Sequence, residues 1–243
     1  MKETVVRVAE GNYHDFLAHL EQLVNIDSGS GFAEGIRQVM DYLVPLLTRL
    51  GCAVAIENKD SDAPVLVARK TGSGTRKFLL LAHIDTVFPV GTARQRSFRI
   101  EGGRAYGPGV TDCKGGTLGQ VYVLKTLLES GFDGFGEIIL VFNSDEEVGT
   151  AASKDLINHI ARECDVAMIF ESPSHPDEFI ISRAGTMNYR IQVTGRAAHS
   201  GVSPEEGRNA IVELMAKLGR IQELQTMDGI HLNIARISGG TKT

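Results

Sequence analysis

The chain has 243 residues, of which 42% are hydrophobic and 23% charged, a globular composition that allows one large core or two domains. Its net charge of −5, without any run of Lys and Arg longer than two, argues against a nucleic-acid partner. No apolar run approaches the length of a transmembrane helix, so we expect no membrane partner.

The three cysteines, Cys52, Cys113 and Cys164, cannot all pair with one another, and they lack the CxxC spacing of redox or metal motifs. The N-terminal residues contain no apolar stretch of signal-peptide length. These features favour a reducing compartment, and we expect a cytoplasmic protein.

Two amphipathic helices are predicted first, over residues 12–25 and 33–50, with Pro45 inside the second and Gly51 at its end. Short apolar runs then predict strands at 53–56, 65–68 and 78–82. The last of these runs is almost continuously apolar, as in a strand buried on both faces. The loop TGSGT (71–75) lacks the following helix that a phosphate-binding loop requires.

Helices predicted at 115–130 and 151–161 alternate with strands at 138–142 and 166–170. This alternation predicts an α/β fold with a mainly parallel sheet and helices on both faces. The pattern changes near Phe179. Two strands within 179–194, a helix at 206–224 and a strand at 231–237 predict part of a smaller α+β domain, so we expect domains at 1–181 and 182–243.

Polar residues follow three of the strand or loop segments, and ligands of open α/β sheets bind at the carboxyl ends of the strands. In LLLAHIDTVFP, His83 can bind zinc while Asp85, on the same side of the chain, accepts its other N–H. A surface histidine at a capped strand end is an equally open interpretation. In AYGPGVTDCKGG, Asp112 is either a helix N-cap, which this motif alone favours, or a carboxylate that bridges two cations. Cys113 is interpreted as a small buried residue.

Three consecutive acids, Asp145, Glu146 and Glu147, end the apolar strand in VFNSDEEVGT. Such a run is usually a solvated surface. At the end of a buried strand, however, like charges are costly unless a cation or a proton compensates them. Neighbouring acids point in different directions, so one can bind metal and the other can act as a general base.

Two further residues complete the candidates, Glu171 in MIFESPS and His199 in GRAAHSG, although each alone is more typical of a structural or surface position. The candidate ligands are therefore His83, Asp112, Glu147 and Glu171. Nitrogen and oxygen donors without a thiolate suit catalytic zinc, with manganese or cobalt as substitutes.

Together the motifs resemble the zinc exopeptidases and deacylases, a family that includes glutamate carboxypeptidase, aminoacylase, acetylornithine deacetylase and succinyl-diaminopimelate desuccinylase. The resemblance is strongest to glutamate carboxypeptidase, which releases C-terminal glutamate from folates and related N-acylglutamates. The matching strings are HIDTV (83–87), GPGVTDCKGG (107–116), DEEVG (145–149), FESP (170–173) and GRAAHSG (195–201).

The resemblance implies a site with two zinc ions. His83 would bind one zinc, oriented by Asp85 and completed by Glu171, while Glu147 would bind the other and Asp112 would bridge both. It also implies a cis peptide between Asp112 and Cys113, where Cys113 replaces the Asp or Met that the family pattern leads us to expect.

The resemblance further implies that Glu146 is the general base and that His199 stabilises the oxyanion in a neighbouring subunit. Residues 1–181 would then be the N-terminal part of a catalytic domain, and 182–243 part of a ferredoxin-like lid or dimerisation domain in a homodimer. Relatives continue beyond this length and supply one more zinc-binding histidine. We therefore expect a truncated chain with weak metal binding at Glu147 and little turnover.

The expected function is a zinc-dependent metallopeptidase that cleaves a C-terminal amide of a small peptide or N-acyl amino acid, releasing glutamate from N-acylglutamate or folate-like substrates. Two alternatives stay open. One is an N-acyl amino acid deacylase of the acetylornithine or succinyl-diaminopimelate type. The other is a non-catalytic binding or dimerisation module that retains the fold.

Overall fold

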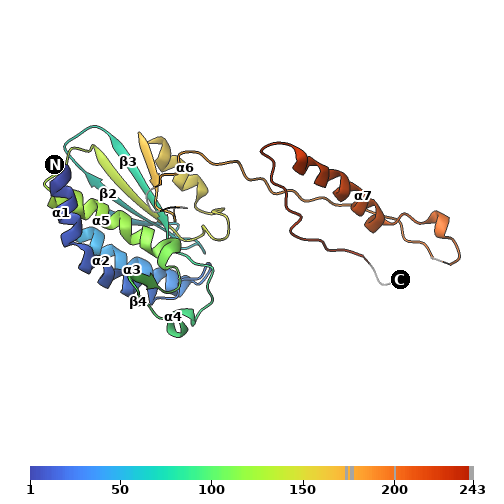
Figure 1. The fold of residues 1–243 in the computed structure, drawn as a ribbon, viewed down its shortest axis with the longest axis horizontal. Helices are drawn as coiled ribbons and strands as arrows, with labels where there is room; N and C mark the ends of the chain where they lie inside the picture. Colours follow the sequence, from blue (N-terminus) through green and yellow to red (C-terminus); the bar gives the residue numbers. More distant parts are fainter. Residues whose placement is uncertain (173–174, 176–177, 200, 241–243) are drawn as a thin grey trace. The chain divides into compact units, whose positions relative to one another are not determined.

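The computed structural model describes residues 1–172, 175, 178–199 and 201–240. The chain divides into two units, Met1–Phe179 and Ile180–Thr243 (Figure 1). The helices of the first unit are α1 (Lys2–Gly11), α2 (Tyr13–Val24), α3 (Ala33–Arg49), α4 (Thr92–Gln95), α5 (Gly116–Glu129) and α6 (Lys154–Arg162), with the short π-helical turn η1 (Val110–Gly115) before α5. Among the described helices, none has both the length and the hydropathy needed to cross a bilayer.

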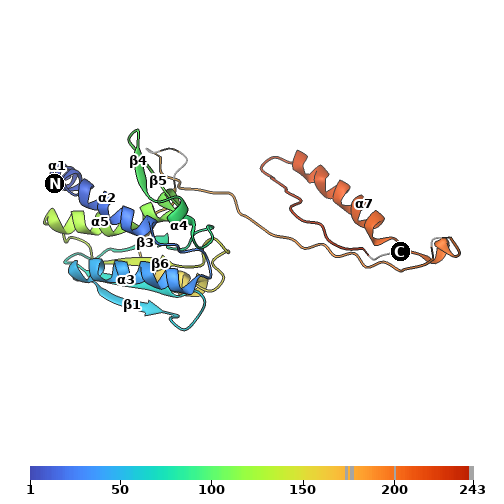
Figure 2. The same cartoon turned by 90° about the horizontal axis from the view of Figure 1, so that it is seen from below.

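The main sheet of the first unit has five strands in the order β1-β2-β6-β3-β7. Their bounds are Ala53–Glu57 (β1), Val65–Thr71 (β2), Lys77–His83 (β3), Glu137–Asn143 (β6) and Val166–Ile169 (β7). Strands β6, β3 and β7 are mutually parallel, so their carboxyl ends lie along one edge of the sheet. A separate two-stranded sheet joins β4 (Arg99–Glu101) to β5 (Arg104–Tyr106) (Figure 2).

The prediction of an α/β fold with helices on both faces is confirmed, but the sheet is mixed rather than mainly parallel. Strand β1 pairs antiparallel with β2, and β2 pairs antiparallel with β6. The cause lies in the connections, because parallel neighbours need a crossover of a dozen or more residues. The loop 58–64 is too short for that between β1 and β2. The loop 72–76 also reverses the chain, so β2 runs opposite to β3 and therefore opposite to β6, which is parallel to β3.

Two apolar layers hold the sheet between helices. Side chains that alternate along the central strands divide between its faces, as period-two geometry requires. One face packs against α2, α3 and α5, which Figure 1 shows on the same side of the sheet, and the other packs against α6. The nearly continuous apolar runs of β3 and β6 thus follow from burial on both faces, as the sequence predicts.

The predicted helices of the first unit are all present, with small shifts. Helix α3 presents Ile36, Val39, Met40, Leu43 and Leu47 to the core at helical spacing and continues through Pro45. Gly51 follows its end with φ +74°, a left-handed conformation that suits glycine. Helix α6 begins three residues later than predicted, and α1 is an addition that the sequence analysis does not predict.

In the part of the second unit that the structure describes, the one long helix is α7 (Ala210–Gln222). The short turns η2 (Pro204–Glu206) and η3 (Glu223–Thr226) flank it in sequence. The Asn209 side chain begins α7 by accepting hydrogen bonds from the amides of Ile211 and Val212. The strands predicted within 179–194 and at 231–237 are not formed in the described residues. Their apolar side chains lack a partner strand, and Ile181 is 96% exposed.

Candidate metal centre

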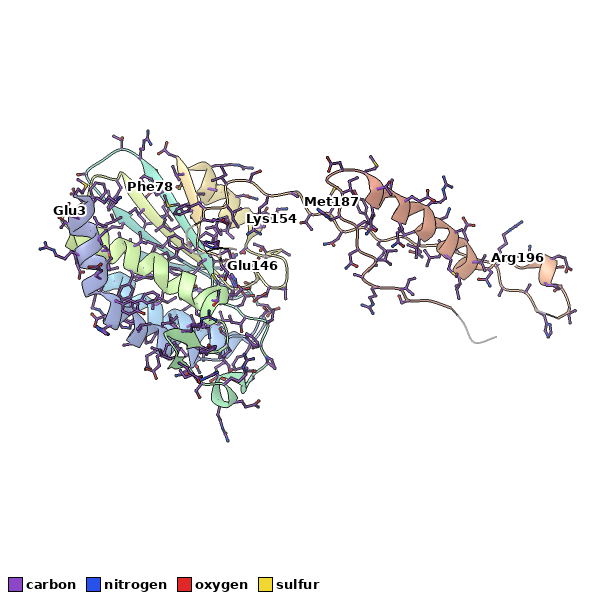
Figure 3. The ribbon with its side chains drawn as sticks, viewed as in Figure 1. Glu3, Phe78, Glu146, Lys154, Met187 and Arg196 are labelled. Atoms are coloured by element: carbon purple, nitrogen blue, oxygen red, sulfur yellow. The ribbon has the colours of Figure 1, made fainter. Side chains whose placement is uncertain are left out.

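The three parallel strands carry the predicted site residues to one edge of the sheet. His83 is the last residue of β3, the acidic run follows β6, and Glu171 follows β7 after Phe170. Backbone hydrogen bonds align these strand ends, since the Ile84 amide donates to the Asn143 carbonyl and the Phe170 amide donates to the Leu81 carbonyl. Glu146 lies at this edge (Figure 3). The strand ends therefore converge, as expected for a ligand site in an open α/β sheet.

His83 lies at the centre of the cluster. Its side chain is 1% exposed, so it is not the surface histidine left open by the sequence. Its Nδ1 donates a 3.0 Å hydrogen bond to the Asp85 backbone carbonyl and lies 3.3 Å from Asp85 Oδ1. Its Nε2 lies 2.9 Å from Asp112 Oδ1 and 3.4 Å from Glu171 Oε1. One ring nitrogen thus faces a buried carboxylate, while the other faces the candidate ligands.

Negative charge accumulates around this imidazole. Burial lowers the pKa of His83, but hydrogen bonding with Asp85, Cys113 and Glu171 raises it overall. For Glu146, burial raises the pKa of the carboxyl, and the carboxylates of Glu171, Asp85 and Asp112 add to the rise against an opposing effect of His83. A cation at this edge would relieve that repulsion.

Asp112 accepts a hydrogen bond from His83 and does not act as a helix N-cap. Helix α5 begins at Gly116, and neither it nor η1 has a side-chain cap. The Asp112 side chain is 60% exposed. The peptide between Asp112 and Cys113 is cis, as the family resemblance implies.

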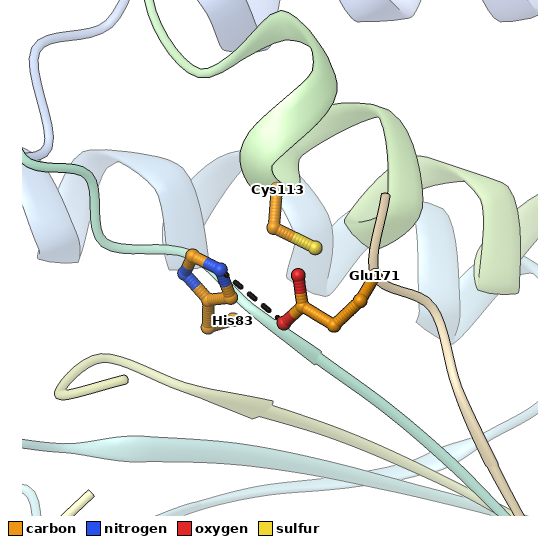
Figure 4. Close-up of side chains that lie close together, drawn as sticks. All are labelled: His83, Cys113 and Glu171. Atoms are coloured by element: carbon orange, nitrogen blue, oxygen red, sulfur yellow. Dashed lines mark ion pairs between the residues drawn. The ribbon is translucent and has the colours of Figure 1, made fainter. Parts of the chain in front are cut away.

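Among the described residues, two groups of side chains have ligand atoms within 4.8 Å of one another. His83, Asp112 and Glu147 form the first, and His83, Cys113 and Glu171 form the second (Figure 4). All four predicted ligands therefore lie together, although His83 and not Asp112 is common to both groups. Imidazole nitrogen and carboxylate oxygens are donors that zinc accepts, so this donor set fits a divalent metal.

Cys113 is closer to the cluster than the sequence analysis anticipates. Its side chain is fully buried, and its thiol donates a hydrogen bond of 2.9 Å to the Phe170 carbonyl. Burial raises the pKa of this thiol, which keeps it protonated. We therefore interpret Cys113 as an anchor for the chain before Glu171 and not as a metal ligand.

The three consecutive acids have different surroundings. Asp145 is buried, and its carboxylate accepts hydrogen bonds from Asn143, Ser153 and the amide of Ala152. That carboxylate closes the loop between β6 and α6. Glu146 is exposed and Glu147 is half-buried, so these two carboxylates are available for chemistry.

Of two residues that the sequence analysis does not single out, Ser30 contacts the site and Lys114 adjoins it in the chain. Ser30, from the loop between α2 and α3, donates a hydrogen bond of 2.7 Å to Asp85 Oδ2. Lys114 is buried and donates to the Ile26 carbonyl, and its burial lowers its pKa to about 8. Lys114 adjoins Asp112 and Cys113 in the chain, whereas no local pattern marks Ser30.

His199 belongs to the second unit, where its Nδ1 accepts a hydrogen bond from the Gly201 amide. Its expected role at a neighbouring subunit stays a prediction. Pro173 of the FESP motif and Ser200 of the GRAAHSG motif lie outside the described residues.

The family model for peptidase family M20/M25/M40 matches residues 79–233, which include every candidate site residue at this edge of the sheet. The chain belongs to peptidase family M20/M25/M40. M20 peptidases are metal-dependent, in agreement with the cluster around His83.

Two curated M20 relatives show how much of the family's length is present. Carboxypeptidase G2 of a Pseudomonas species is 40% identical over 198 residues, which cover 80% of this chain and 48% of that protein. Acetylornithine deacetylase of Proteus mirabilis is 33% identical over 208 residues, covering 82% and 52%. The chain thus spans about half the length of these relatives.

A solved structure shows the same fold. A tripeptidase from Staphylococcus aureus superposes with a TM-score of 0.68 at 21% identity, covering 94% of this chain and 61% of that one.

Proposed function

We propose that the complete protein is a zinc-dependent hydrolase that cleaves a C-terminal amide bond and releases glutamate from N-acylglutamate or folate-like substrates. The observation that carries the proposal is the convergence of His83, Asp112, Glu147 and Glu171 at one sheet edge, with Glu146 beside them. The 40% identity to carboxypeptidase G2 supports the carboxypeptidase branch of the family.

His83, Asp112, Glu147 and Glu171 would hold two zinc ions. Asp112 would be their shared ligand, as the family resemblance implies, although His83 is the residue common to both groups in the structure. When bound, the zinc ions supply positive charge that polarises an amide carbonyl and acidifies water. Asp85 keeps the His83 imidazole oriented by holding its Nδ1, and it leaves Nε2 directed at the ligand cluster.

Glu146 would act as the general base. Its carboxylate is exposed at the cluster, so it can take a proton from water and return it to the leaving amine. Burial raises the pKa of this carboxyl, which suits a group that must both accept and donate a proton. His199 from a partner subunit would stabilise the oxyanion in a homodimer.

Replacement of Glu146 by Gln tests the assignment in the complete protein. The variant should keep its metal content and lose turnover of an N-acylglutamate by about 10²–10⁴-fold, because the amide cannot accept the proton. Turnover at the wild-type rate would contradict the assignment of Glu146 as the general base.

The deacylase alternative is favoured by the 33% identity to acetylornithine deacetylase. A substrate panel separates the two. Faster hydrolysis of N-acylglutamates than of N-acetylornithine supports the carboxypeptidase, and the reverse order supports the deacylase. A complete protein that binds no metal and hydrolyses neither substrate would be the non-catalytic module. The cytoplasmic location stays a prediction.

A further inference from the structure

The Asp85 carboxylate joins the two parts of the candidate metal centre. It is fully buried, and its Oδ1 lies 3.3 Å from His83 Nδ1 and accepts a 3.2 Å hydrogen bond from the Glu146 amide. Its Oδ2 accepts from the Glu147 amide at 3.2 Å and from the Ser30 hydroxyl at 2.7 Å. This carboxylate therefore contacts the central imidazole, whose Nδ1 also bonds to the Asp85 backbone carbonyl at 3.0 Å, and it holds the backbone of the acidic loop.

Ser30 makes the shortest of these contacts, and its own position is fixed by the backbone. The Ser30 amide donates to the Thr86 carbonyl, and the Thr86 amide donates to the Ser28 carbonyl. This short parallel bridge ties the loop between α2 and α3 to the segment that follows Asp85. The hydroxyl is thereby held at the carboxylate without help from the acidic loop.

Without the Ser30 hydroxyl, the hydrogen bond that remains to Asp85 Oδ2 among the described residues is the longer one from the Glu147 amide. A buried carboxylate keeps one orientation only while its donors fix it, and rotation about its terminal torsion is otherwise easy. Rotation would lengthen the contacts to the Glu146 and Glu147 amides together with the contact to His83. The hydroxyl thus acts on metal ligands that it does not itself touch.

We propose that Ser30 is a positioning residue of the metal centre, which locks Asp85 so that His83 and the acidic loop present their ligand atoms together. The inference rests on the proposed function, since it concerns the same ligands. It predicts that the hydroxyl matters and that the size of the side chain does not.

Three substitutions of Ser30 separate these effects. Ser30→Thr keeps the hydroxyl, Ser30→Val has the same shape as Thr without it, and Ser30→Ala removes it with little change in volume. Ser28→Ala is the matched control from the same loop, because the Ser28 hydroxyl is buried and has no hydrogen-bond partner among the described residues.

The first measurement is Co²⁺ binding to the chain, followed by its visible absorption. Ser30→Ala and Ser30→Val should weaken Co²⁺ binding by about 10-fold, the lower end of the range for residues that orient metal ligands. Ser30→Thr and Ser28→Ala should stay within about 2-fold of the wild type. Equal affinities for Ser30→Val and Ser30→Thr would overturn the proposal.

The second measurement needs no metal, so it separates failure of this inference from failure of the proposed function. Amide hydrogen exchange at Glu146 and Glu147 should quicken several-fold in Ser30→Ala and Ser30→Val but not in Ser28→Ala. Unchanged exchange would overturn the role of Ser30. A wild-type chain that binds no Co²⁺ would count against the metal centre itself, and the exchange rates would still decide the role of Ser30.

Discussion

Asp145 and Glu146 are adjacent acids whose carboxylates have different surroundings. The Asp145 carboxylate is buried and saturated with donors from Asn143, Ala152 and Ser153, whereas Glu146 is exposed. A sequence can show that three acids end a buried strand. It cannot show which carboxylate accepts hydrogen bonds from its own loop, because those bonds depend on the backbone path of residues 146–153.

Asp145→Asn should destabilise the fold by about 2–4 kcal/mol, because an amide NH₂ would face buried donors and leave them unpaired. The exposed Glu146→Gln is the matched control and should change the free energy of unfolding by less than about 0.5 kcal/mol. Urea denaturation of both variants measures the difference. Equal stabilities would contradict the division of roles between these acids.

Cys52 gives the fold a pH dependence remote from the metal centre. Burial raises the pKa of its thiol to about 11 from an ordinary value of 9.0, with Lys70 opposing the rise. Between these values the unfolded chain loses the thiol proton while the folded chain keeps it. The resulting stabilisation is fully present below pH 9 and declines as pH rises towards 11.

Cys52→Ala should therefore lose less stability than the wild type between pH 9 and pH 11. The difference in unfolding free energy between the two proteins should shrink by about 2 kcal/mol over that window. Each unit of pKa shift contributes about 1.4 kcal/mol once the pH has passed through it completely. Chemical denaturation at several pH values provides the measurement. A constant gap would show that the folded thiol titrates normally.

At the scale of elements, α5 is packed so closely on the chain after β7 that only glycine fits at its start. A Cβ on Gly116 would lie 1.8 Å from the Phe170 carbonyl oxygen, whereas one on Gly119 would lie 3.6 Å from the Phe170 ring. The close approach sets the position of Phe170 and thus of Glu171. The start of helix α5 and the predicted ligand Glu171 are coupled in this way.

Gly116→Ala should destabilise the first unit by about 2 kcal/mol or more and weaken metal binding at the His83 and Glu171 side, because the backbone must move. Gly119→Ala, one turn later in the same helix, should be neutral or stabilise by about 0.5–1 kcal/mol through its higher helix propensity. Thermal melts with zinc titration compare the two. The account of α5 fails if both variants behave alike.

The central elements could be predicted because their signals are local. The apolar runs of β3 and β6 and the helical spacing of α3 and α5 are visible in the sequence and are confirmed. Strand pairing depends on residues far apart in the chain, so the sequence analysis does not predict the antiparallel pairing of β1 with β2 and of β2 with β6. The contact between Ser30 and Asp85 spans 55 residues and follows from the tertiary fold alone.

The strands predicted in the second unit illustrate the opposite limit. Residues 179–194 show the alternation of a half-buried strand, but a strand forms only when a neighbour satisfies its backbone. In the described residues no such ladder forms, and Ile181 and Tyr189 are exposed by 96% and 79%. The alternating pattern favours a strand, but the described residues of this unit supply no partner strand for it to pair with.

For the whole molecule, the division into two units places the complete cluster of His83, Asp112, Glu147 and Glu171 in the first one. The apolar cores on both sides of the main sheet also belong to that unit. The candidate metal centre thus lies within the first unit. Substrate choice and the role of His199 stay proposals for the complete protein, because this chain spans about half the length of its relatives.

The most direct test of the central claim is anomalous X-ray scattering at the zinc edge from crystals of the complete protein grown with zinc. We predict two peaks about 3.5–4 Å apart, one beside His83 and Glu171 and one beside Glu147, with Asp112 between them. Absence of any peak within reach of His83 Nε2, with zinc bound elsewhere or not at all, would contradict the account.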